Sequence, residues 1–397
     1  MITIKTKNSV LWIGITILLA SAALMGDFAI YPAADAIFNH FPDTHITILN
    51  FILSGTSLMI IFASLLCGVM AQYYSKKVLL VISYSMFFVC AFFGAVVDNA
   101  VYMAVMRGLT GIAMGSIGTL LAGLIAELFV DEQKRSTMMG LYTGIMAALG
   151  AVISLGAGYL AVNDWHLVFR IYLFALPMIA LILIFIPYTP PEGKQAEGDA
   201  VDEKFPVLPI LGMTGTAFIV NAMYGVIMTM VAVFLAEEAI GDAATAGIMG
   251  SLGTVGSCIG CLVFIVLYMR FKHFVPALFS LLMGAAYLTL GFSENTIIIG
   301  ILCTILGSTY GLGYSYFLMH ASVIVPASRA SLAIAFANAG IYLGLFSGPY
   351  VPMVFQGIFN VDTIAATMPY MAALLGIVGI ILSFNGARTR NLEKKNA

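Results

Sequence analysis

The chain has 397 residues, of which 61% are hydrophobic and only 9% are charged. A soluble globular domain carries about 25% charged residues, so this composition excludes an ordinary soluble enzyme and indicates a membrane protein. The formal net charge of −2 gives no sign of nucleic-acid binding, and the five scattered histidines make no metal-binding pattern. No phosphate-binding loop of the form G-x-x-x-x-G-K-S/T occurs, so we expect no direct drive by ATP.

Apolar runs long enough to cross a hydrocarbon core of ~30 Å recur along the whole chain. They predict twelve transmembrane helices, with approximate bounds 10–38, 46–71, 78–97, 100–128, 137–162, 166–188, 207–236, 243–269, 274–292, 297–322, 330–356 and 366–385. The segment 189–206 is polar, carries both charge signs and is bracketed by prolines, which is typical of a flexible linker. The sequence therefore predicts an all-α membrane protein with two six-helix bundles, 1–188 and 207–397.

The basic residues are distributed unequally between the predicted loops. Fifteen of the seventeen Lys and Arg residues fall at the two ends of the chain or in every second loop, while the other loops carry only acids. Because basic residues favour the cytoplasmic side, both termini are expected in the cytoplasm. The first apolar run is too long for a secretory signal and has no small-residue cleavage site, so it is interpreted as a retained helix of a bacterial inner-membrane protein.

Four segments resemble motifs of the major facilitator superfamily. The loop after the second span, GVMAQYYSKKVLL, is similar to G-x-L-A-D-R-x-G-R-K-x-x-L, and MRGLTGIAMG in the fourth span is similar to R-x-x-Q-G-x-G. DWHLVF before the sixth span and YLGLFSGPYV in the eleventh also match segments frequent in the family. The resemblance, closest to the drug/proton antiporter group, implies the major facilitator fold with twelve helices in two bundles that rock during transport.

The chain departs from these motifs at positions that matter for gating. The motif Asp is Gln72 and the motif Gly is Ser75, so the resemblance implies a cytoplasmic latch that is weakened or built differently. The expected gating residues are Gly68, Gln72, Lys76, Lys77 and Glu127, although Glu127 could also be a solvated helix end. The antiporter motif of the fifth span survives only at Gly150 and Gly158, which weakens the argument for export.

Two charged residues lie well inside predicted spans rather than near their ends, Asp27 in the first and Arg107 in the fourth. Each costs roughly 2.5–3.5 kcal/mol in lipid, so such residues usually face a cavity and have a function. Their distances from the outer helix ends differ by about one helical turn. The resemblance implies that both helices line the central cavity, so we expect the two side chains to share it. Movement of Arg107 would change the proton affinity of Asp27; the alternative is a fixed structural ion pair.

Polar-tipped aromatic residues and amides recur at helical spacing in four spans. They predict a substrate-binding wall that includes Asp27 and Arg107 and is formed further by Tyr31, Asn221, Tyr224, Met228, Tyr310, Tyr314, Phe317, Asn338 and Tyr342. Core packing is the alternative interpretation for each of them. His320 and Asp35 are interpreted as polar contacts rather than as functional groups.

Taken together, these patterns predict a monomeric secondary transporter that uses no cofactor or metal and is not an enzyme. The favoured function is proton-coupled antiport, with efflux of small amphipathic or cationic organic molecules. A first alternative is proton-coupled uptake of a small metabolite such as an organic anion. A second alternative is a receptor or scaffold that transports nothing.

Overall fold

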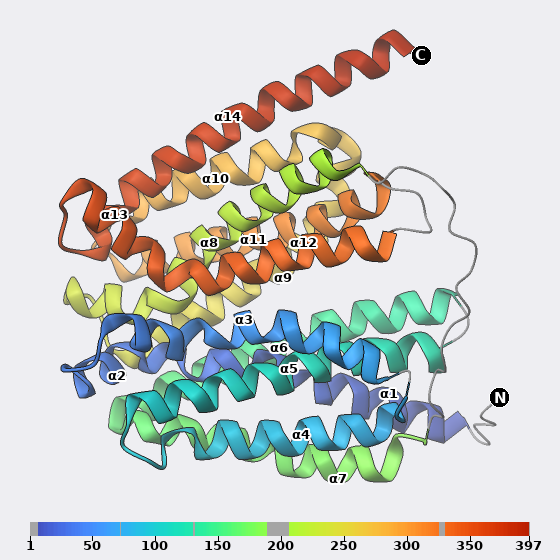
Figure 1. The fold of residues 1–397 in the computed structure, drawn as a ribbon. Helices are drawn as coiled ribbons and strands as arrows, with labels where there is room; N and C mark the ends of the chain where they lie inside the picture. The colour runs from blue at the N-terminus through green and yellow to red at the C-terminus, as the bar shows by residue number, and fades with distance from the viewer. Residues whose placement is uncertain (1–6, 72, 130–131, 189–205, 325–329, 397) are drawn as a thin grey trace. The chain divides into compact units, whose positions relative to one another are not determined.

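The computed structural model describes residues 7–71, 73–129, 132–188, 206–324 and 330–396. The described chain is almost entirely helical and divides into two compact units, Met1–Ala200 and Val201–Ala397 (Figure 1). The linker that the sequence predicts at 189–206 lies outside the described residues except for its last position. Its boundaries therefore stay a prediction.

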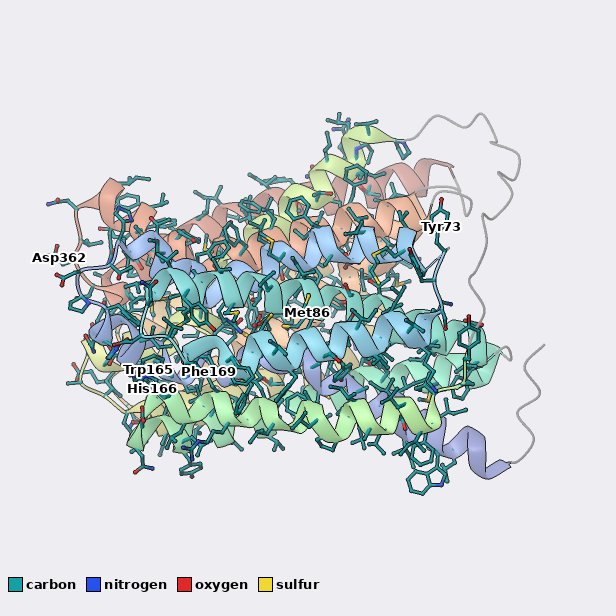
Figure 2. All side chains as sticks on the ribbon, turned by 60° about the horizontal axis from the view of Figure 1, so that its bottom comes forward. Tyr73, Met86, Trp165, His166, Phe169 and Asp362 are labelled. Carbon is teal, nitrogen blue, oxygen red and sulfur yellow. The ribbon has the colours of Figure 1, made fainter. Side chains whose placement is uncertain are left out.

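In the first unit, four short elements make up the first predicted span, and the next five spans follow in chain order. The elements are α1 (Lys7–Ala20), η1 (Ser21–Ala29), η2 (Tyr31–Ala33), α2 (Ala34–His40), α3 (Ile46–Met70), α4 (Lys76–Phe92), η3 (Phe93–Ala95), α5 (Ala100–Leu128), α6 (Glu132–Asn163), η4 (Trp165–Phe174) and α7 (Ala175–Phe185). The long helices lie side by side in Figure 1. In Figure 2, Tyr73 lies at one end of this unit and Trp165, His166 and Phe169 lie at the opposite end.

The second unit repeats this arrangement of long helices. Its elements are α8 (Val207–Glu237), α9 (Ala243–Phe271), η5 (Lys272–Phe274), α10 (Val275–Leu290), α11 (Thr296–Ile324), α12 (Ala330–Ser347), η7 (Gly348–Tyr350), α13 (Val351–Phe359) and α14 (Ile364–Asn396). Eleven helical stretches of the described chain are long and apolar enough to cross a membrane. The remaining predicted span, 330–356, corresponds to α12, η7 and α13. The all-α class and the multi-pass membrane character are thus confirmed.

Several predicted spans differ from the structure in their local geometry, among them the sixth, which begins as the 3₁₀ segment η4, and the eleventh, which η7 interrupts. The first is not one α-helix, because the 3₁₀ segments η1 and η2 separate α1 from α2. Pro32 lies in η2, has no backbone N–H and cannot continue an α-helical hydrogen-bond ladder. The last helix continues to Asn396 rather than ending at 385, so Arg388 lies in a helix and not in a tail.

Close helix contacts fix the position of the central residues of each unit. A Cβ at Gly111 of α5 would lie only 2.5 Å from the carbonyl oxygen of Thr56 in α3. In the second unit, a Cβ at Gly344 of α12 would lie 2.5 Å from the carbonyl oxygen of Phe218 in α8. Glycine allows the two backbones to touch at both places. The contact at Gly111 sets the spacing of α3 and α5 one turn away from Arg107.

Candidate functional site

The first unit contains a buried ion pair between Asp27 in η1 and Arg107 in α5. Arg107 Nη2 donates a hydrogen bond of 2.5 Å to Asp27 Oδ1, and Arg107 Nε donates one of 2.9 Å to the carbonyl of Ile52. The hydroxyl of Thr56 donates to Asp27 Oδ2 at 2.6 Å. Asp27 is 7% exposed and Arg107 is 1% exposed. The pair thus joins the first, second and fourth spans in a dry environment.

This arrangement uses both carboxylate oxygens of Asp27 but not every donor of Arg107. Within the described chain, Arg107 Nη1 is buried and has no hydrogen-bond partner. Removal of one member of a buried pair costs about 3–5 kcal/mol because the other charge is left uncompensated. Tyr31, which the sequence also predicts here, is 8% exposed and lies within electrostatic range of Arg107.

The second unit brings several of the predicted wall residues together. The rings of Tyr224 in α8 and Tyr310 in α11 are stacked, with centroids 4.2 Å apart and an interplanar angle of 11°. The ring of Tyr314 lies 6.1 Å from that of Tyr310. Asn221, one turn from Tyr224, is 1% exposed and donates to the carbonyl of Ala217 at 2.7 Å.

Amide oxygens in this cluster are left without hydrogen bonds. Among the described residues, Asn221 Oδ1 and Asn338 Oδ1 are buried and have no donor. A buried acceptor without a partner is unfavourable unless a ligand or water satisfies it. Tyr342, four residues after Asn338, lies within electrostatic range of Tyr310. These residues therefore form an aromatic surface that carries hydrogen-bond acceptors.

Other predicted wall residues lie apart from this cluster. Phe317 is 1% exposed, and its ring packs edge-to-face on Phe279 of α10 at 5.7 Å. That contact is core packing, the alternative that the sequence leaves open for this residue. Met228 is half-buried in α8. Outside this set, the ring of His320 stacks on that of Tyr316 at 5.1 Å.

The predicted gating residues lie near the loop between α3 and α4. Lys76 is buried, and its ammonium group donates to the Glu127 carboxylate at 2.9 Å, so Glu127 is paired rather than simply solvated. Lys77 donates to the carbonyl of Leu183 at 2.7 Å, near the last turn of α7. A Cβ at Gly68 would meet open space. Gln72 lies outside the described residues.

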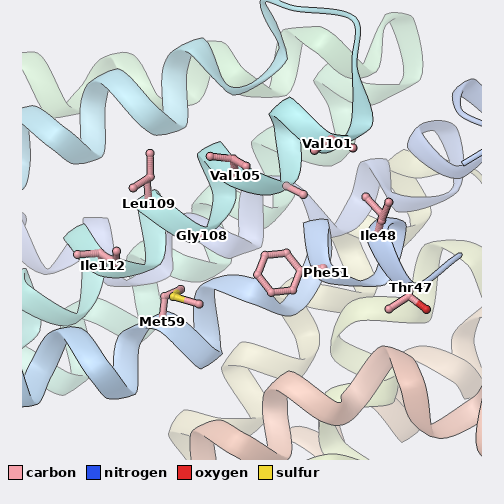
Figure 3. Close-up of a pocket in the computed structure, with 10 residues that line it drawn as sticks. Thr47, Ile48, Phe51, Met59, Val101, Val105, Gly108, Leu109 and Ile112 are labelled. Atoms are coloured by element: carbon pink, nitrogen blue, oxygen red, sulfur yellow. The ribbon is translucent and has the colours of Figure 1, made fainter. Parts of the chain in front are cut away.

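An apolar cavity of about 470 Å³ lies between α3 and α5 (Figure 3). Phe51 and Met59 line it from α3, and Val105 and Leu109 line it from α5. None of the described residues that line it carries a charged side chain. The titratable chemistry of this unit is therefore at the pair and not in this cavity.

Analysis of the sequence missed Thr56 as a partner of Asp27. Thr56 lies within the tripeptide Gly55-Thr56-Ser57 in the apolar second span, and this interruption was the available signal. The carbonyl of Ile52 could not be predicted, because any backbone carbonyl can serve as an acceptor.

Comparison with known proteins identifies the family. The sequence model described as Major Facilitator Superfamily matches residues 16–349. The chain belongs to the Major Facilitator Superfamily. It is 25% identical to Protein spinster homolog 1 of Xenopus laevis over 129 residues, and 26% identical to the Xenopus tropicalis protein over 135 residues. Each match covers 32% of this chain and only 24% of the relative.

Solved structures of this superfamily share the fold over nearly the whole chain. A bacterial homologue of the human lysosomal transporter Spinster, inward-facing and occupied, has a TM-score of 0.76 with 14% identity and covers 97% of this chain and 98% of its own. The xylose transporter XylE from E. coli has a TM-score of 0.73 with 14% identity, and the match covers 93% of this chain and 94% of that transporter. The nucleoside transporter NupG has a TM-score of 0.69 with 12% identity, and the match covers 95% of this chain and 98% of that transporter. The protein is thus a membrane transporter with the major facilitator fold.

Proposed function

We propose that the protein is a proton-coupled secondary transporter in which Asp27 carries the proton and Arg107 is its partner. The observation that carries this proposal is the buried salt bridge of 2.5 Å, in which the second carboxylate oxygen is held by Thr56. A buried carboxylate and guanidinium are stable together, but each is costly alone. Proton binding to Asp27 therefore has to accompany a rearrangement of Arg107, and this linkage is what energy coupling requires.

The geometry supports uptake of a small organic anion or another solute with hydrogen-bond acceptors. In the paired state both oxygens of Asp27 are occupied and the pair is neutral, so a cationic molecule gains little attraction from it. Protonation of Asp27 would free the guanidinium, whose Nη1 already has no acceptor. A guanidinium binds carboxylates and phosphates strongly and with defined geometry. The efflux of cationic molecules that the sequence favours stays a prediction without support from this geometry.

Tyr224, Tyr310 and the Asn221 amide are proposed as further substrate contacts. Stacked phenol rings provide an apolar face with polar tips, and the free amide oxygen of Asn221 can accept a hydrogen bond. The solved structures of a xylose and a nucleoside transporter with the same fold are compatible with a small polar metabolite as substrate.

The proposal also includes the organisation of the chain. We propose that the bundles 1–188 and 207–397 rock about the linker 189–206 and that the Lys76–Glu127 pair takes part in closing the cytoplasmic side. We also propose that the protein is a monomer in a bacterial inner membrane, and the basic loops favour an orientation with both termini in the cytoplasm. Reporter fusions at both ends of the chain test this orientation, and activity of a periplasmic reporter at either end contradicts it.

The test is transport in proteoliposomes that contain the purified protein. An inward proton gradient is imposed, and a panel of labelled carboxylates, phosphates, sugars and amines is offered outside or loaded inside. We expect accumulation of an acceptor-bearing solute, and we expect Asp27→Asn to abolish it while exchange of labelled for unlabelled solute continues. Asp35→Asn is the matched control, because Asp35 lies in the same span but contacts only Asn39 in the described chain, at 3.1 Å.

Three outcomes contradict the proposal. Gradient-driven accumulation that survives in Asp27→Asn removes Asp27 from the coupling step. Extrusion of amines against the proton gradient establishes antiport in place of uptake. No movement of any solute under any gradient favours the receptor or scaffold.

A further inference from the structure

The backbone that carries Asp27 is a 3₁₀ helix and not an α-helix. The segment η1 runs for nine residues, Ser21–Ala29, and Asp27 is the seventh of them. Runs of 3₁₀ helix longer than 3–4 residues are uncommon, and those inside a longer helix often mark a functional hinge. The first span of the second unit, α8, is α-helical over 31 residues and contains no such segment. The other 3₁₀ segment of comparable length in the described chain, η4 (Trp165–Phe174), carries Tyr172, whose hydroxyl donates to the carbonyl of Gly26 in η1. The two long 3₁₀ segments of the first unit therefore meet beside the ion pair.

The hydrogen bonds around Gly26 show what keeps the segment in this form. The Ile30 N–H donates to the carbonyl of Asp27, three residues earlier, at 3.1 Å. In an α-helix it would donate to Gly26, four residues earlier. The Gly26 carbonyl instead accepts a hydrogen bond of 2.9 Å from the hydroxyl of Tyr172 in η4. Tyr172 thus occupies the acceptor that the α-helical register would use.

Aromatic side chains from neighbouring spans enclose the segment on this side. The ring of Phe87 in α4 packs edge-to-face on Tyr172 with centroids 5.7 Å apart. A Cβ at Gly26 would lie 3.1 Å from Phe87. The hydroxyl of Tyr84 donates to the carbonyl of Ala20, the residue directly before the segment. Two buried tyrosine hydroxyls therefore hold the backbone, one at the start of the segment and one beside Asp27.

The register of this segment decides where the carboxylate points. A 3₁₀ helix turns about 120° per residue and an α-helix about 100°. Over the six steps from Ser21 to Asp27 the difference accumulates to about 120° of rotation about the helix axis. If α1 stays in place, conversion to the α-helical register would therefore turn Asp27 away from Arg107.

We propose that η1 converts between 3₁₀ and α-helical registers, and that Tyr172 is a positioning residue that holds the 3₁₀ register in which Asp27 meets Arg107. This inference rests on the proposed function, since it states how the pair opens during transport. Release of the Gly26 carbonyl by Tyr172 allows Ile30 to bind it. The carboxylate then leaves the guanidinium and can take up a proton.

In the described chain, the titratable groups near Asp27 and its segment are Arg107 of α5, Tyr172 of η4, Tyr31 of η2 and Tyr84 of α4. Tyr142 of α6 lies within electrostatic range of Tyr84. The four tyrosines are neutral near pH 7. Arg107 is therefore the charged group among them whose distance from Asp27 decides the proton affinity.

The first test is the variant Tyr172→Phe, with proton-driven uptake measured as a function of pH. Loss of the hydroxyl favours the register in which Asp27 is unpaired, and an unpaired buried carboxyl takes up a proton more readily. We expect the pH of half-maximal uptake to rise by about one unit, which corresponds to a roughly tenfold change in the population of the two registers.

The matched control is Tyr287→Phe in the second unit. The Tyr287 hydroxyl donates to the carbonyl of Met223 in α8 at 2.5 Å, and its ring is fully buried. This variant loses the same kind of bond from tyrosine to helix backbone, far along the chain from Asp27. We expect a lower thermal unfolding temperature for both variants and a changed pH profile for Tyr172→Phe alone. Equal pH profiles of the two variants overturn the proposal.

A second variant, Pro32→Ala, reaches the same equilibrium by another route. It restores a backbone N–H that can donate to Phe28 in the α-helical register, so its pH profile should shift in the same direction as that of Tyr172→Phe. A shift in the opposite direction, or none in a folded variant, contradicts the inference. If Asp27→Asn abolishes coupling while Tyr172→Phe and Pro32→Ala behave as wild type, the proposed register change is contradicted and the proposed function is supported. If transport by Asp27→Asn stays coupled to the proton gradient, both the register change and the proposed function are contradicted.

Discussion

The energetic importance of the buried pair can be measured by removing its members singly and together. Arg107 is 1% exposed and donates hydrogen bonds to Asp27 and to the carbonyl of Ile52. In the variant Arg107→Met the side chain keeps its length but loses its charge, and Asp27 retains only the hydroxyl of Thr56. An uncompensated buried carboxylate of this kind destabilises a protein by about 3–5 kcal/mol.

The double variant Asp27→Asn/Arg107→Met should lose less stability than Arg107→Met alone. It leaves no buried charge, and the Asn oxygen can still accept a hydrogen bond from Thr56. Because the two members are in direct contact, their effects should not add, and we expect an interaction free energy of about 3 kcal/mol. This value is the difference between the sum of the single effects and the effect of the double variant.

The chain offers a convenient assay, since Cys67, Cys90 and Cys303 are free and buried. A thiol-reactive fluorescent dye reports their exposure during heating in detergent, and apparent unfolding temperatures are compared because such unfolding is often irreversible. The control is the pair Lys76–Glu127, in which Glu127 is 31% exposed, so its interaction free energy should be no more than about 1 kcal/mol. Additive effects of Asp27 and Arg107, or an interaction as small as that of the control, would refute the electrostatic reasoning.

Three further predictions concern single side chains. Thr56→Val removes the hydroxyl bound to the carboxylate of the pair, so the unfolding temperature should fall by an amount equivalent to about 1.5–3 kcal/mol, and an unchanged temperature contradicts that bond. The backbone N–H and ring of His166 lower the pKa of exposed Asp164, whose contribution to stability is therefore present above its ordinary pKa and lost on acidification. Asp164→Asn should remove this acid dependence from unfolding curves measured between pH 6 and pH 3. Gly344→Ala would place a methyl group 2.5 Å from the backbone of α8 and should lower the unfolding temperature. Gly212→Ala places its methyl group in open space and should raise the unfolding temperature slightly. Similar effects of the two variants would contradict the close contact between α8 and α12.

The helical architecture could be predicted from the sequence because lipid imposes simple rules. Every spanning segment must satisfy its own backbone hydrogen bonds, so long apolar runs become helices. The proximity of Asp27 and Arg107 was predicted from their similar depth together with the family resemblance, which implies that the first and fourth helices line one cavity. The same reasoning found the partners Lys76 and Glu127 only as separate gating candidates, because both lie at helix ends where water is an alternative.

The local geometry of the site could not be predicted in this way. The 3₁₀ register of η1 depends on hydroxyls from Tyr84 and Tyr172, which lie more than fifty residues away in sequence. Helical spacing placed Phe317 on the same face of its helix as Tyr310 and Tyr314. It could not show which neighbouring helix that face meets, and the structure places Phe317 against Phe279.

Each unit contains a buried tyrosine whose hydroxyl donates to the backbone of that unit's first span. Tyr84 donates to Ala20, and Tyr287 donates to Met223, and both pairs are separated by 64 residues. Seven residues after Ala20 comes Asp27, whereas seven residues after Met223 comes Met230. By sequence spacing, Met230 therefore corresponds to Asp27, although α8 is α-helical where η1 is a 3₁₀ helix.

The other half of the pair has changed in the same way. Gly111 packs on the backbone of Thr56, and Gly307 packs on that of Gly253, so these contacts mark equivalent places. Arg107 comes four residues before Gly111, and Cys303 comes four residues before Gly307. A buried charge is costly alone, so the two members have to be kept or lost together. Introducing Asp at residue 230 and Arg at residue 303 together should therefore be tolerated better than either alone, and equal loss of expression in all three variants would show that the two positions do not face each other.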